Sequence, residues 1–119
     1  MQRPTAPRPF GAEHMATKSL DEVVSDLGVE HRSRAALWTL VAAGPAARPA
    51  VRRGLHDPVP AVRRGCCEYL DLYWDDDVAA HLVSLLSDPD PGVSWMAGHA
   101  LSCERCKQDD SWAKRPPAQ

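Results

Sequence analysis

A ten-residue segment of this chain occurs twice, and the spacing between the two copies limits the available folds more than any other feature. Residues 55–64 read LHDPVPAVRR, and residues 86–95 read LSDPDPGVSW. The copies share a leucine, an Asp-Pro pair, a second proline and a valine, each 31 positions apart, and Leu70 and Leu101 continue the match. Self-similarity at a period of this length is typical of solenoids, in which each unit buries its apolar face against the next. The sequence therefore predicts a stack of similar units.

Proline and capping signals indicate where the helices begin. Proline supplies a preset φ and lacks only an amide that the first helical turn leaves unpaired, so Pro60 and Pro91 each predict a helix start. Ser19 and Glu22 form a capping box, which predicts a short helix that ends near Leu27. The remaining predicted helices, with approximate bounds, cover residues 30–43, 46–56, 60–74, 77–86 and 91–107.

Helix pairs at this period, joined by a tight Asp-Pro turn that leads into Val-Arg-Arg, resemble HEAT repeats of the type found in small bacterial HEAT-like proteins and phycobilin-lyase relatives. The Leu-x-Asp-Pro-x-Pro-x-Val core carries the resemblance, which covers about residues 45–107. It implies an all-α, short right-handed α-solenoid of HEAT-like helical hairpins with about six helices. It also implies a non-enzymatic scaffold that binds a partner protein.

The repeats divide the chain into three parts. Residues 1–18 are rich in proline and arginine without periodicity, which predicts a disordered arm. Residues 19–107 form the predicted repeat domain, and residues 108–119 a tail that caps the last helix. Fewer than three full units are legible, whereas stacked repeats usually need about three for stability. We therefore expect the stack to be completed by the flanking segments, by a partner protein or by a second copy of the chain.

Composition favours a cytoplasmic protein without membrane contact. The N-terminal segment has no apolar run that could serve as a signal peptide or a membrane span. In the cytoplasm the four cysteines are expected to stay reduced. Catalytic motifs are missing from the sequence: it has no glycine-rich phosphate loop, no nucleophile elbow and no His-Glu-x-x-His pattern. We expect no enzymatic activity.

A nucleic-acid surface is not expected either. The net charge is −2, whereas such surfaces normally carry a basic excess. Guanidinium groups in two successive helices could still converge on a phosphate backbone. The candidates are Arg48, Arg52, Arg53, Arg63 and Arg64. Carboxylates nearby in the sequence favour salt-bridged helix faces instead.

His99, Cys103 and Cys106 form one stripe of the predicted last helix, because they are separated by four and then three residues. Thiolate and imidazole suit zinc or copper, so the stripe is a candidate metal or thiol-handling site. A structural zinc ion would need a fourth ligand that the sequence does not clearly supply. The simpler interpretation gives these cysteines a structural role and the protein no cofactor.

The outer face of the last helix is also the leading candidate for partner binding. Aligned at 31 residues, Glu68 and Leu72 of one copy become His99 and Cys103 of the next, so the scaffold does not require them. Exposed tryptophans often anchor interfaces. The candidate partner-binding residues are Trp95, His99, Trp112, Arg63 and Arg64. Two further predictions concern burial: Trp38 and Trp74 should seal the core near helix ends, and Cys66 should be buried with Cys67 half exposed.

Overall fold

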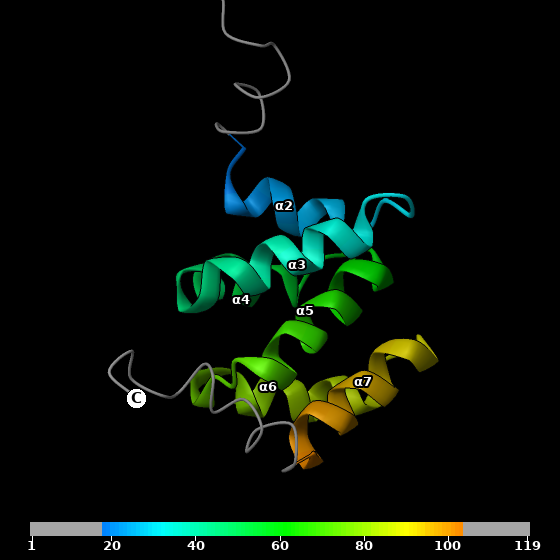
Figure 1. Cartoon of the computed structure of the whole chain (residues 1–119). Helices are drawn as coiled ribbons and strands as arrows, with labels where there is room; N and C mark the ends of the chain where they lie inside the picture. Colours follow the sequence, from blue (N-terminus) through cyan, green and yellow to red (C-terminus); the bar gives the residue numbers. More distant parts are fainter. Residues whose placement is uncertain (1–17, 104–119) are drawn as a thin grey trace, which may run out of the picture.

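Every regular element in the computed structural model is a helix within residues 18–103, the part of the chain that the structure describes (Figure 1). The α-helices are α2 (Leu20–Asp26), α3 (Ser33–Ala43), α4 (Arg48–Gly54), α5 (Pro60–Leu72), α6 (Ala79–Ser84) and α7 (Pro91–Ser102). Three short 3-10 helices flank them: η1 (Gly44–Ala47) leads into α4, η2 (Asp76–Val78) leads into α6, and η3 (Leu85–Ser87) follows α6.

The helices pack as three successive hairpins. α2 contacts α3, α4 contacts α5, and α6 contacts α7. Between hairpins, α2 contacts α4, and α5 lies between α3 and α7 and touches both. Figure 1 shows this succession from α2 at one end to α6 and α7 at the other. The arrangement confirms the predicted short all-α solenoid.

The local signals for helix starts were accurate. Pro60 and Pro91 are the first residues of α5 and α7. At α2 both halves of the capping box form, because the Ser19 hydroxyl accepts from the Glu22 amide at 3.1 Å and the Ser19 amide donates to Glu22 Oε1 at 2.8 Å. These two hydrogen bonds satisfy backbone amides that have no carbonyl partner within the first helical turn.

Two predicted boundaries were wrong. α3 begins at Ser33 rather than near Glu30, because the chain between α2 and α3 forms turns. α7 ends at Ser102 rather than near residue 107. The Ser102 hydroxyl donates to the carbonyl oxygen of Gly98 at 2.8 Å, which satisfies one acceptor of the last turn from the side chain. Cys103 therefore follows the helix instead of lying within it.

The core runs through all three hairpins. Its largest fully buried side chains are Tyr69, Leu40, Leu55, Leu70, Leu82, Val51, Val62, Val93, Cys66 and Cys67. Tyr69 forms a buried hydrogen bond within this core, because its hydroxyl donates to the carbonyl oxygen of Gly44 at 2.5 Å. Gly44 ends α3 with φ of 65°, a left-handed conformation that glycine adopts without strain.

Two burial predictions require correction. Trp38 does not seal the core, since 58% of its surface is exposed. The inner face of α3 is set by Ala36 and Leu40, and a residue two positions from each points the opposite way at about 100° per residue. Cys67 is fully buried rather than half exposed. Trp74 is partly buried and packs against the core, in line with its prediction.

Candidate functional site

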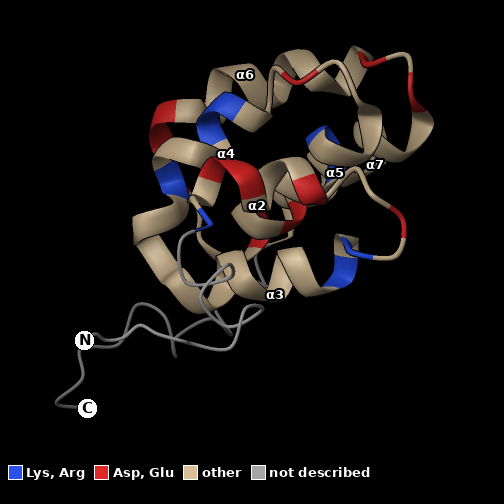
Figure 2. Cartoon of the chain, turned by 90° about the horizontal axis from the view of Figure 1, so that it is seen from above, with Lys and Arg blue, Asp and Glu red and all other residues tan. Residues whose placement is uncertain are grey.

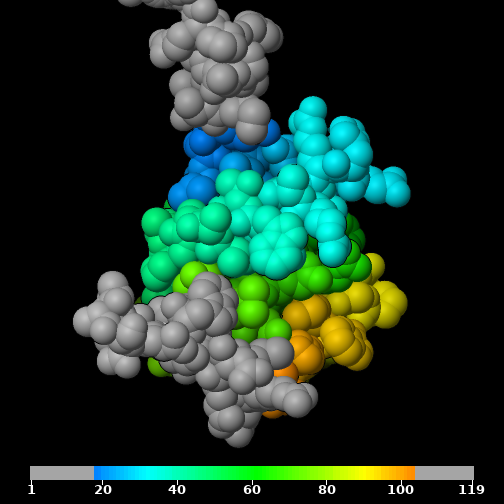
Figure 3. Space-filling model, viewed as in Figure 1, coloured from blue at the N-terminus to red at the C-terminus, as the bar shows by residue number. Residues whose placement is uncertain are grey.

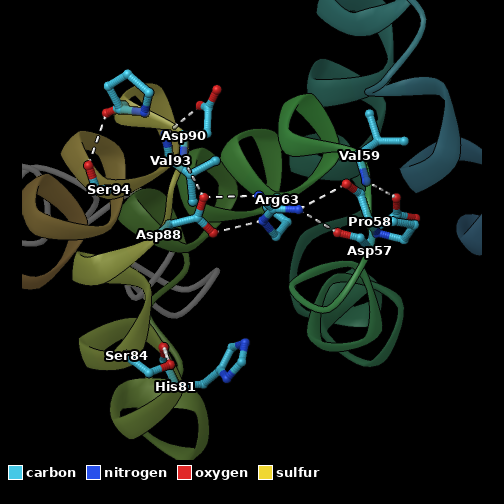
Figure 4. A network of polar contacts seen from close by, with 11 residues as sticks. Asp57, Pro58, Val59, Arg63, His81, Ser84, Asp88, Asp90, Val93 and Ser94 are labelled. Atoms are coloured by element: carbon cyan, nitrogen blue, oxygen red, sulfur yellow. Dashed lines mark hydrogen bonds and ion pairs between the residues drawn. The ribbon is translucent and has the colours of Figure 1, made fainter.

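Arg63, a predicted partner-binding residue, instead joins two successive repeats (Figure 4). Its Nε and Nη2 donate to the two carboxylate oxygens of Asp88, both at 2.9 Å. Its Nη1 donates to the backbone carbonyls of Asp57 at 2.9 Å and Pro58 at 3.1 Å. Only 14% of the Arg63 side chain and 5% of the Asp88 side chain are exposed. A guanidinium held this way is part of the scaffold, and Arg63 does not belong to the candidate surface.

The two aspartates in this joint also shape their own turns. Asp57 Oδ1 accepts from the Val59 amide and Asp88 Oδ1 from the Asp90 amide, each at 2.9 Å. These side-chain turns explain why the Asp-Pro pair recurs in the sequence. Hydrogen bonds from Arg63 hold the pKa of the Asp88 carboxyl below its ordinary value.

The arginines that could have formed a phosphate-binding patch are mostly held by other groups. Arg52 donates to Asp75 and Asp77, and Arg53 donates to Asp21. Arg48 donates to the backbone carbonyl of Trp74 at 2.9 Å. Figure 2 shows acidic and basic residues interspersed over the helices rather than gathered in separate patches. The salt-bridged helix faces expected from the sequence are confirmed.

Two arginines differ from the rest. Within residues 18–103, Arg34 and Arg64 are the arginines for which the structure shows neither an ion pair nor a hydrogen bond. Both line one hollow of about 230 Å³ between α3 and α5. Leu37, Trp38 and Glu68 also line it. The hollow therefore combines two available cations with an exposed indole ring and one carboxylate. Sequence reasoning proposed Arg64 but missed Arg34 and placed Trp38 in the core.

This hollow belongs to a continuous face. α3, α5 and α7 lie side by side on it, as the space-filling view shows (Figure 3). Arg64 also reaches toward α7, where its Cδ would lie 3.5 Å from a Cβ built on Gly92. Trp95 projects from α7 with 67% of its surface exposed, as predicted. Because α3, α5 and α7 are the second (B) helices of the three hairpins, we call the surface formed by Arg34, Trp38, Arg64 and Trp95 the B-helix face.

His99 lies beside Trp95 and connects α7 to α5. The two rings stack nearly parallel, with centroids 5.2 Å apart and an interplanar angle of 9°. His99 Nε2 lies 3.2 Å from Asp71 Oδ2, and the Asp71 side chain is only 10% exposed. The histidine therefore has its ring plane fixed by Trp95 and its edge directed at a buried carboxylate.

Cys103 completes a cluster at this point. One ligand atom each from Asp71, His99 and Cys103 lie within 4.8 Å of one another. The Cys103 amide donates to the carbonyl oxygen of His99 at 2.8 Å, which holds the residue close to the end of α7. The structure thus brings together two of the three predicted metal-stripe residues, while Cys106 and the predicted interface residue Trp112 lie outside the described residues.

Sequence reasoning missed Asp71 because its partners come from the next repeat. One signal was available: Asp71 is a carboxylate between Leu70 and Leu72, within the apolar half of α5. Cys66 and Cys67, by contrast, are unsuited to ligand chemistry. Burial raises the pKa of both thiols, that of Cys67 to about 12, so neither offers a thiolate near neutral pH.

Comparison with known families agrees with this architecture. The HEAT-repeat family matches residues 20–102, so the chain belongs to the family of HEAT-repeat proteins. HEAT repeats commonly mediate protein–protein interaction, and proteins of this family are typically scaffolds rather than enzymes. No match was found among curated proteins or among solved structures. None of the helices between residues 18 and 103 has the length and apolar character needed to cross a bilayer.

Proposed function

We propose that this HEAT-repeat protein is a non-enzymatic adaptor whose B-helix face binds an acidic, partly apolar segment of another protein. The observation that carries the proposal is the hollow between α3 and α5, which contains the two unpaired arginines of the described region. A guanidinium without a carboxylate partner can form charge-assisted hydrogen bonds to an incoming carboxylate. The exposed rings of Trp38 and Trp95 add apolar anchors of the kind that dominate interface energetics.

The charge of the hollow favours a peptide over a polyanion. Arg34 and Arg64 supply two positive charges, and Glu68 on the same wall supplies one negative charge. A nucleic-acid backbone would bring successive phosphates past Glu68 and would gain little net attraction. One or two carboxylates flanked by apolar side chains match the hollow better, because Leu37 and Trp38 would cover the apolar part.

Selection from a library of short random peptides on the immobilised full-length protein tests this proposal. The selected peptides should be enriched in Asp or Glu next to aromatic or aliphatic residues. Their binding should weaken by at least about tenfold in Arg34→Ala and in Arg64→Ala, which corresponds to the loss of one charge-assisted hydrogen bond. Arg53→Ala is the matched control, because Arg53 is exposed but paired with Asp21, and it should leave binding unchanged.

Two results would contradict the proposal. One is a library that yields no enrichment over an unrelated protein. The other is a set of peptides whose affinity is the same in wild type, Arg34→Ala and Arg64→Ala, since such peptides would bind elsewhere. Affinity should also fall as salt is added, because the attraction depends on partly exposed charges.

Finer features of the proposed adaptor rest on sequence resemblance. We infer from the Leu-x-Asp-Pro-x-Pro-x-Val segment that the protein is akin to small bacterial HEAT-like proteins and phycobilin-lyase relatives, and that it acts in the cytoplasm. The short stack also supports self-association as a second mode of use. Native mass spectrometry of the full-length chain distinguishes the two modes, because a stable dimer that dissociates in Trp95→Ala would assign part of the B-helix face to a second copy.

A further inference from the structure

A second site, which adjoins the proposed peptide surface at Trp95, lies where α5 meets the end of α7. Asp71 contributes a carboxylate, His99 an imidazole and Cys103 a thiol, and one ligand atom from each falls within 4.8 Å of the others. We propose that these three side chains bind a divalent transition metal ion of the zinc class.

The spacing of the ligand atoms fits such an ion. Zinc bonds of about 2.0 Å to nitrogen or oxygen and about 2.3 Å to sulfur, arranged tetrahedrally, place ligand atoms roughly 3.3–3.6 Å apart. Asp71 Oδ2 and His99 Nε2 are already 3.2 Å apart. The Cys103 sulfur needs to approach by at most roughly 1.3 Å, since no separation in the cluster exceeds 4.8 Å. A side-chain rotation at Cys103, which follows the helix, can supply this movement.

The mixture of ligand atoms selects the class of metal. Calcium and magnesium require oxygen ligands, whereas copper(I) prefers sulfur-rich sites. A set of one oxygen, one nitrogen and one sulfur suits zinc, and cobalt(II) is a spectroscopic substitute of similar geometry. Binding requires that the Cys103 thiol release its proton to solvent and that His99 be neutral, so affinity should fall as the pH is lowered. Three protein ligands leave the fourth coordination position for a further group.

The surroundings of His99 favour a metal site over a simple ion pair. An ion pair between His99 and Asp71 would need neither the thiol of Cys103 nor a fixed ring plane. Trp95 stacks flat on the imidazole and limits its rotation. In the preceding repeat the positions of His99 and Cys103 are occupied by Glu68 and Leu72, so the scaffold alone does not demand a nitrogen and a sulfur here.

Titration of the metal-stripped full-length protein with cobalt(II) tests the site. Wild type should bind one equivalent and show the visible bands of tetrahedral cobalt together with a thiolate-to-cobalt charge-transfer band, all abolished by added zinc. Cys103→Ser should lose the charge-transfer band. His99→Gln and Asp71→Asn should each weaken binding by at least about 100-fold, because even the loss of a group that only hydrogen-bonds to a metal ligand costs about 10–100-fold.

Control variants separate the site from adventitious binding. His31→Gln and Asp76→Asn change exposed residues of the same types outside the cluster and should bind cobalt like wild type. Circular dichroism checks that each variant is folded. The proposal is overturned if wild type gives no cobalt bands, or if the charge-transfer band persists in Cys103→Ser, because another thiol would then be the ligand. Unchanged affinity in both folded variants, His99→Gln and Asp71→Asn, would also overturn it.

Discussion

Replacement of Arg63 by methionine should be among the most costly single changes outside the apolar core. Arg63 makes two charge-assisted hydrogen bonds to Asp88 and two hydrogen bonds to backbone carbonyls of its own turn. Methionine preserves most of the apolar stem of Arg63. It removes the counter-ion of the Asp88 carboxylate, whose side chain is only 5% exposed in the wild-type structure. Breaking a deeply buried pair in this way costs about 3–5 kcal/mol, and an exposed pair contributes at most about 1 kcal/mol. Because 14% of Arg63 is still exposed, we expect a loss of about 2–3 kcal/mol.

Thermal unfolding measures this loss directly. For the 86 residues between 18 and 103, an unfolding entropy of about 2.1 cal/mol/K per residue gives about 0.18 kcal/mol/K. A loss of 2–3 kcal/mol should therefore lower Tm by roughly 11–17 °C. Asp88→Asn keeps an acceptor for the Asp90 amide, so the double variant Arg63→Met/Asp88→Asn should lose less than the sum of the single changes.

Arg53 provides the matched control for this experiment. It donates to Asp21 through the same two nitrogen atoms at 3.0 and 2.9 Å, but both side chains are exposed. Arg53→Met should leave Tm close to the wild-type value. The reasoning fails if Arg63→Met lowers Tm no more than Arg53→Met does, because burial of the pair would then have no energetic consequence.

The pH dependence of the same pair has a defined sign. Arg63 holds the pKa of Asp88 below its unfolded value, so the stabilisation is present above the unfolded pKa and is lost as the pH falls through the folded one. The Tm difference between wild type and Arg63→Met should therefore narrow below about pH 4. A difference that stays constant down to pH 2 would contradict the assignment to an ionised Asp88.

Three further predictions concern the core. A Cβ at Gly54 would lie 2.6 Å from the Cys66 sulfur, so Gly54→Ala should lower the free energy of unfolding by about 1–3 kcal/mol, as measured with denaturant. A Cβ at Gly98 would meet only ordinary contacts, so Gly98→Ala should raise the free energy of unfolding by about 0.5–1 kcal/mol. Equal effects of the two changes would refute the steric argument. Tyr69→Phe leaves a backbone carbonyl without its donor and should cost about 1–2 kcal/mol. Burial raises the pKa of Tyr69 to about 12, so as the pH rises the phenol ionises first in the unfolded state. Wild type should therefore lose stability above about pH 10, and Tyr69→Phe should reduce this loss. Burial and a raised pKa should keep Cys66 and Cys67 unreactive toward a thiol reagent until denaturant is added, and rapid reaction of all four thiols in native buffer would contradict this.

Most of the fold could be predicted because its determinants are local. Pro60, Pro91 and the Ser19 capping box act within one helical turn, and each marks a helix start that the structure confirms. Helix ends were harder. No glycine or proline follows Ser102 for more than ten residues, so nothing in the sequence indicated that α7 would stop there.

Only some residues of the candidate sites could be predicted from the sequence, because both sites depend on contacts between repeats. His99 and Cys103 share one segment and could be paired by spacing, but Asp71 joins them only through the packing of α5 against α7. Likewise, Arg34 and Arg64 are far apart in the sequence and meet only because α3 and α5 line the same hollow. A side chain's partner is decided by which helices are neighbours, and periodicity alone does not give the lateral offset between them.

The repeat itself explains how scaffold and surface are divided. Asp57 and Asp88 are equivalent in the two copies, and both form the same side-chain turn. Arg63 has no such equivalent, because Ser94 occupies its position one period later and its hydroxyl donates to the backbone carbonyl of Pro91 within the same helix. The aspartate therefore forms the turn in both copies, whereas Arg63 forms the joint between the second hairpin and the third.

The same comparison applies to the exposed positions of α5 and α7. Arg64 is replaced by Trp95, and Glu68 is replaced by His99, one period apart in each case. None of these four residues is fully buried, so the stack tolerates each exchange without repacking. The turn aspartates and the buried valines Val62 and Val93 repeat, whereas the positions on the B-helix face do not, so the surface chemistry of a repeat can change while its turn and core are preserved. Each proposed site contains residues at which the two copies differ, Arg64 and Trp95 in the peptide surface and His99 in the metal site.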